Sequence, residues 1–175
     1  MKSRYWNLLL PDQVESRSPP EQFAVYAIAY LDSAERLCRL LARSSRKATY
    51  ERGIVVLYLT AHAVELFLKG AILRKAPKER FGHNLEHIYK RYNALYRARR
   101  YRFQMPFQTD YTNMPKNQIK AAKALVRPID QLYRYPLDKD GKPWPGLYAF
   151  EANSFLQGLI VLRTTFERLI QDYDC

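Results

Sequence analysis

One stretch of the sequence, residues 49–75, restricts the possible folds more than any other. No proline interrupts it, and apolar residues cover most of its circumference when it is drawn as a helix. Such a helix is normally buried at the centre of a bundle or spans a membrane. The uncharged run from Gly53 to Val64 has only twelve residues, and Glu65 and Lys69 follow it closely. Since a membrane span needs about twenty, we expect the central helix of a bundle and no membrane partner.

The rest of the chain predicts further helices around this one. Ser18 followed by Pro19 and Glu21 is typical of a helix start. Apolar residues recur every three or four positions in the segments 18–42, 85–96, 117–127 and 151–172. The dipeptide Asp140-Gly141 predicts a turn or small hairpin within 134–146. The expected fold is therefore all-α, an antiparallel up-and-down bundle of about five helices with a turn or hairpin before the last. Residues 1–17 are interpreted as a tail and 18–175 as one domain.

Composition indicates a packed intracellular protein. Of the 175 residues, 47% are hydrophobic, which argues for a core and against disorder. The two cysteines, Cys38 and Cys175, have no metal-ligand spacing, which favours a reducing, cytoplasmic setting. The first residues, MKSRYWNLLLPDQ, contain an apolar run of only three leucines, which is too short for a signal peptide. No sequence signature predicts a cofactor or a metal site.

Positive charge is large and unevenly distributed. The net charge is +12, and residues 74–102 contribute ten Lys or Arg against two Glu. This excess favours a polyanionic partner. Within it, Arg97, Arg99, Arg100, Tyr101 and Arg102 combine arginines that fit phosphate with a tyrosine that could stack on an unpaired base. A solvated helix end with cations near its dipole is the alternative. Without a helix-turn-helix signature, single-stranded RNA is favoured over duplex DNA.

A polar strip interrupts the central helix. His62, Glu65 and Lys69 are three and four residues apart, so they share one face. They predict either a solvent-facing Glu–Lys pair or a polar strip lining a groove between helices, to which His83 would also belong. Because a buried charge costs several kcal/mol unless it is paired, accidental placement in the core is unfavourable. Asn84 is a better candidate than His83 for capping the following helix.

These residues also form two short motifs. His62-Ala-Val-Glu65-Leu-Phe-Leu-Lys69, a spacer, and then Gly82-His83-Asn84-Leu85 resembles the HEPN superfamily (higher eukaryotes and prokaryotes nucleotide-binding). The later Arg134-Tyr-Pro followed by Asp140-Gly141 is similar to the segment before the last helix in several members. The resemblance covers most of residues 20–173.

The resemblance implies a compact helical bundle, often a homodimer, that binds RNA or a nucleotide-containing ligand, frequently in defence or toxin–antitoxin systems. One alternative it carries is a metal-independent endoribonuclease toxin that uses an Arg-x(4–6)-His motif. Arg80 and His87 have that spacing, although Phe81 stands where a polar residue is usual. Such a histidine would transfer the proton and the arginine would stabilise the phosphoryl charge. A second alternative is a non-catalytic dimerisation or protein-interaction module, whose charge would serve an acidic partner or antitoxin protein.

Overall fold

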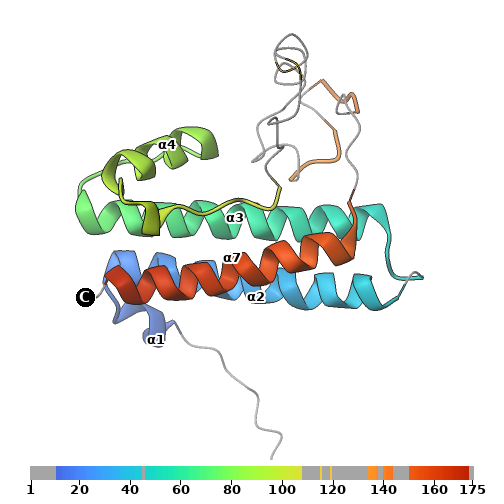
Figure 1. Cartoon of the computed structure of the whole chain (residues 1–175), viewed down its shortest axis with the longest axis horizontal. Helices are drawn as coiled ribbons and strands as arrows, with labels where there is room; N and C mark the ends of the chain where they lie inside the picture. Colours follow the sequence, from blue (N-terminus) through green and yellow to red (C-terminus); the bar gives the residue numbers. More distant parts are fainter. Residues whose placement is uncertain are drawn as a thin grey trace, which may run out of the picture.

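The computed structural model describes residues 11–44, 46–107, 115, 119, 134–137, 140–143 and 150–173, and every regular element within them is helical. Three long helices, α2 (Pro19–Arg43), α3 (Tyr50–Lys75) and α7 (Ala152–Tyr173), lie side by side, and the shorter α4 (Leu85–Leu95) packs on α3 on the side away from α2 and α7 (Figure 1). The all-α expectation is therefore confirmed for the described part of the chain.

The helices begin and end close to the expected positions because local capping fixes them. Ser18 precedes α2, and its backbone N–H and hydroxyl both donate to the Glu21 carboxylate, at 2.8 and 2.5 Å. Asn84 caps α4 by accepting a hydrogen bond from the backbone N–H of His87 at 3.0 Å. Such a cap satisfies an amide that has no partner within the helix. Of the helix expected from Asn117, only Ile119 lies among the described residues, and it is helical.

Two smaller features complete the described chain. A short α1 (Asp12–Glu15), which the sequence did not predict, lies within the segment interpreted as a tail. Leu137 and Pro143 form an isolated antiparallel bridge around a turn in which Gly141 has a φ of 73°, a conformation that favours glycine. The turn predicted before the last helix is thus present.

The long helices pack through α3. Gly70 of α3 lies against Phe23 and Pro20 at the start of α2, so α2 and α3 run antiparallel. The Phe67 ring stacks on Phe166 of α7, with 3.7 Å between ring centroids. Fourteen residues of α3 are buried, which accounts for its apolar circumference. By length and composition alone α3 could also cross a membrane, but most of its apolar window is covered by the other helices.

A buried carboxylate links α2 to α7. Glu35 accepts hydrogen bonds from Arg39 on its own helix and from Arg163 of α7, the latter at 2.8 Å. Burial alone would raise the pKa of Glu35, but the two guanidinium groups outweigh it and the pKa is lowered. One turn further along α2, the Cys38 thiol donates to the carbonyl of Ala152, the first residue of α7, at 3.3 Å.

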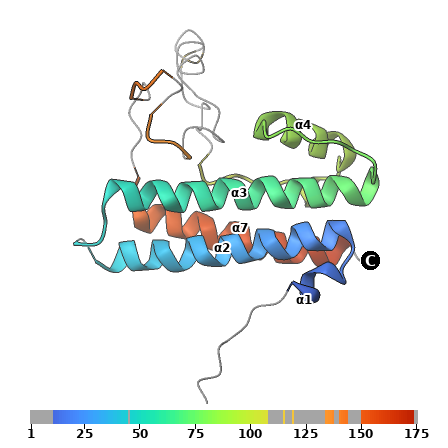
Figure 2. The same ribbon diagram turned by 180° about the vertical axis from the view of Figure 1, so that it is seen from behind.

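The direction of α4 differs from the expectation of antiparallel neighbours. Leu85 at its start lies by the middle of α3, and the Tyr96 hydroxyl after its end donates to the Ala71 carbonyl at 2.7 Å. Residues 76–84 therefore run back along α3, and α4 then follows the same direction as α3 (Figure 2). The antiparallel prediction was wrong for this helix because the connection of residues 76–84 is not a tight turn that would reverse the chain. Here it is an irregular return segment.

Candidate functional site

The return segment brings the two halves of the sequence motif together. Glu65 and Lys69 of α3 form an ion pair with 2.5 Å between the Lys69 Nζ and the Glu65 Oε1. The same oxygen lies 3.0 Å from the His83 Nδ1, from the segment before α4. Glu65 and Lys69 are only 7% and 8% exposed, so the solvent-facing alternative for this pair is wrong. Lys69 also lies over the Phe81 ring, 5.8 Å from its centroid.

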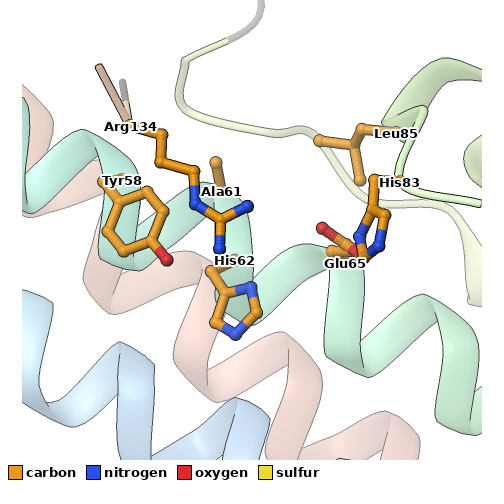
Figure 3. Close-up of a pocket in the computed structure, with 7 residues that line it drawn as sticks. All are labelled: Tyr58, Ala61, His62, Glu65, His83, Leu85 and Arg134. Carbon is orange, nitrogen blue, oxygen red and sulfur yellow. The ribbon is translucent and has the colours of Figure 1, made fainter. Parts of the chain in front are cut away.

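A small pocket opens beside this cluster. Its lining residues come from α3, from the start of α4 and from the turn before the last helix: Tyr58, Ala61, His62, Glu65, His83, Leu85 and Arg134 (Figure 3). The volume is about 60 Å³. At roughly 15 Å³ for each water position, that holds about four water molecules or one small polar group.

Within the pocket, a cationic guanidinium lies opposite a carboxylate. The guanidinium of Arg134 lies above His62 and beside Tyr58, whereas His83 and Glu65 lie together on the other side (Figure 3). The His62 ring is held between Tyr30, an edge contact at 4.6 Å, and the stacked ring of Tyr58 at 5.9 Å. Burial lowers the pKa of His62, opposed by nearby Glu65. His62 is therefore neutral at neutral pH and can accept or donate one hydrogen bond.

The cationic residues gather at a second place, where α3 and α7 end. We call this the basic pole and define it by residues of three segments, α3, the segment after α4 and α7: Arg74, Lys75, Arg97, Arg99, Arg100, Arg102 and Arg168. Lys75 lies over the Tyr96 ring at 4.6 Å and Arg74 over the Tyr173 ring at 5.9 Å. Arg168 of α7 donates to the Arg100 carbonyl at 2.9 Å, which ties the segment after α4 to the last helix.

The arginines of the segment 97–102 are exposed and carry free charge. Arg97 donates to the Ala94 carbonyl, Arg100 to the Tyr101 hydroxyl, and Arg102 to the Asn93 amide oxygen. None of these acceptors is charged, and within the described residues no acidic side chain pairs with this segment, Arg99 included. An exposed guanidinium without a carboxylate remains available for phosphate.

Tyrosines form the floor of the basic pole. Tyr101 lies 5.1 Å from Tyr96 and 5.9 Å from Tyr173 between ring centroids, with the Arg100 guanidinium over it at 4.8 Å. The hydroxyls of Tyr92 and Tyr173 are 2.9 Å apart. Burial raises the pKa of Tyr96 to about 12, so its hydroxyl stays protonated and donates. Tyr101, predicted to stack on bases, is thus half-buried and already packed against other rings.

The predicted catalytic pair is not assembled within the chain. Arg80 lies in the return segment and His87 in the first turn of α4, both side chains are exposed, and no hydrogen bond joins them in the described structure. The ribonuclease interpretation stays a prediction. A search of the described residues for three or more His, Cys, Asp or Glu side chains that could share a metal ion finds none.

Sequence reasoning did not place four of the lining residues in the pocket: Tyr58, Ala61, Leu85 and Arg134. Tyr58 lies four residues before His62, so helical spacing could have placed it on the same face. Arg134 is 59 positions after the end of that helix, and no local pattern could have placed it there. Comparisons of the chain with protein-family models, with curated proteins and with solved structures find no match.

Proposed function

We propose that the protein is a HEPN-like helical protein that binds single-stranded RNA through the basic pole. The observation that carries the proposal is the convergence of cations from α3, α7 and the segment after α4, with Arg97, Arg99 and Arg100 lacking acidic partners among the described residues. Phosphate neutralisation by such a cluster supplies most of the affinity in non-specific RNA binding.

Membership of the HEPN superfamily is supported by the contact between its motif residues. Glu65 and Lys69 come from one motif and His83 from the other, and all three meet in one hydrogen-bonded cluster. The proposal includes a fifth helix from Asn117 and a homodimer, both expected from the sequence.

The test is the affinity for a labelled 12-nucleotide RNA of mixed sequence, measured by fluorescence anisotropy over a range of salt concentrations. In the triple variant Arg97→Ala, Arg99→Ala, Arg100→Ala we expect weaker binding and a salt dependence shallower by about 2 in log–log slope, since each phosphate contact on a single strand contributes about 0.7.

A matched control removes equal charge elsewhere. Arg43, Arg46 and Arg52 are exposed near the junction of α2 and α3, at the end of these helices remote from the basic pole. Their triple alanine variant should bind like the wild type. If both triple variants lose the same RNA affinity, the loss reflects the lower net charge of the protein and not the position of the arginines. If the protein binds RNA negligibly but forms a tight complex with an acidic protein, the partner of the basic pole is a protein and not RNA.

A further inference from the structure

Glu65 has one carboxylate oxygen that the described protein leaves unsatisfied. Lys69 and His83 both contact Oε1, at 2.5 and 3.0 Å, and no donor among the described residues reaches Oε2. In Figure 3 one oxygen of Glu65 lies against His83 and the other points away from it into the pocket. The residue is only 7% exposed. This oxygen faces the pocket, and a carboxylate oxygen is an acceptor only, so it suits a ligand that brings an N–H group.

Across the pocket, Arg134 supplies hydrogen-bond donors opposite the Glu65 acceptor. Its guanidinium has five N–H donors in a planar fork and no acceptor. It lies 5.9 Å from the centroid of the Tyr135 ring, and among the described residues no acceptor is hydrogen-bonded to it. Of the remaining lining residues, Tyr58, Ala61 and Leu85 are aromatic or apolar, and His62 and His83 add two imidazole rings. A ligand that fits all these groups is planar, with an amino donor and a ring acceptor on one polar edge.

We propose that this pocket binds the edge of one unpaired nucleobase that carries an exocyclic amino group. The amino group would donate to the Glu65 Oε2 and a neighbouring ring acceptor would receive a hydrogen bond from Arg134. Carboxylates accept from the N4 amino group of cytosine in the same way in base recognition. Uracil is excluded as the preferred base because it presents a carbonyl oxygen there. The proposal rests on the proposed RNA binding and adds a base preference to it.

The pocket lies within reach of a strand held at the basic pole. Leu85 lines the pocket at the start of α4, and Arg97 follows the end of the same helix. The 11 residues of α4 span about 16 Å at 1.5 Å per residue. A stacked single strand rises about 3.4 Å per nucleotide, so roughly five nucleotides connect the two places. Octamers are therefore long enough to occupy both, and trimers are not.

The decisive experiment compares the affinities of oligo(C) and oligo(U) octamers, which are both pyrimidines but differ in the amino group. We expect the wild-type protein to bind the C octamer about tenfold more tightly, within the range for one well-placed base contact. An octamer of N4,N4-dimethylcytidine, which lacks the donor, should bind like oligo(U). Trimers should show no preference between C and U.

Two variants assign the preference to the pocket. Glu65→Gln, checked for folding by circular dichroism, should reduce the C over U ratio to within twofold, because the amide can also donate to the uracil carbonyl. Arg134→Ala should weaken C-octamer binding several-fold, whereas Glu86→Gln, an exposed carboxylate on α4, should change nothing.

The outcomes separate the two proposals. If neither octamer binds, RNA binding itself is refuted. If both bind equally well, or if the dimethylated octamer binds as tightly as oligo(C), the base pocket is refuted while RNA binding stands. The comparison of the three octamers uses the wild-type protein, so it stays informative even if Glu65→Gln does not fold.

Discussion

Replacing Lys69 with methionine separates a buried ion pair from an exposed one within the same chain. Both the pair Glu65–Lys69 and the pair Glu86–Lys90 have the same i,i+4 spacing, with N···O distances of 2.5 and 2.7 Å. Their side-chain exposures differ: 10% and 9% for Lys69 and Glu65, but 69% and 74% for Lys90 and Glu86. The two ion pairs therefore have similar geometry and differ in how far they are buried.

Breaking a buried pair by removing one partner costs about 3–5 kcal/mol, because it leaves an uncompensated charge. Since Glu65 reaches solvent through the pocket, we expect the lower end, about 3 kcal/mol for Lys69→Met. For Lys90→Met we expect less than about 1 kcal/mol. Urea denaturation followed by circular dichroism measures both. At an m-value of about 2 kcal/mol/M, the Lys69 variant should lose about 1.5 M in midpoint.

The double variant Glu65→Gln with Lys69→Met tests whether the unpaired Glu65 carboxylate causes the loss of stability in Lys69→Met. Because it removes the charge as well as its partner, it should recover at least half of the stability lost in Lys69→Met. If Lys69→Met costs no more than Lys90→Met, or if the double variant is less stable than the single one, the burial of this pair is not what the structure implies.

Two further predictions concern packing and pH. A Cβ at Gly70 would lie 3.0 Å from the Pro20 carbonyl oxygen, so Gly70→Ala should lower the melting temperature by about 2–8 °C, as overpacking of 1–2 kcal/mol outweighs the gain in helix propensity. Gly82→Ala, where nothing lies within 4 Å, should leave it within about 2 °C, and equal effects would contradict the close approach of α2 and α3. Hydrogen bonds from the backbone of Ser154 and Asn153 lower the pKa of Glu151 to about 2, so its contribution to stability is present above pH 4.5 and is lost as pH falls toward 2. Thermal melts of Glu151→Gln and wild type should therefore differ at pH 6 and converge near pH 2, and a difference that grows as pH falls would refute a stabilising role of these hydrogen bonds.

The sequence predicted what local chemistry decides. The start of α2 follows from a hydroxyl and a carboxylate three residues apart, and the start of α4 from one asparagine. Both caps act within a few residues, so they can be read without knowing the fold. The central burial of α3 was predictable for a related reason, since an apolar circumference leaves no face suited to water.

The direction of α4 and the composition of the pocket could not be predicted in this way. Both depend on residues that are distant in the sequence and close in space, such as Arg134 and His62 in the pocket. The tyrosines illustrate the same limit. Tyr92 and Tyr96 lie in the apolar repeat of segment 85–96 and are 0% and 2% exposed, but that repeat does not indicate that Tyr173 and Tyr101 join them in one cluster.

The two candidate surfaces lie at opposite ends of one short helix, and this bears on how they could act together. The start of α4 contributes to the pocket, and the segment after its end carries the arginines. Tyr92 and Tyr96 anchor that helix on α3 through the hydroxyl bond from Tyr96 to Ala71 and the ring contact of Tyr92 with Phe67 at 6.3 Å. Since an 11-residue helix is marginal by itself in water, its position depends on these rings. Tyr96→Phe removes the bond to the Ala71 carbonyl while keeping the ring. We therefore expect that variant to weaken octamer binding more than trimer binding, because only the octamer spans both ends. Equal weakening would mean that α4 does not hold the two surfaces in register.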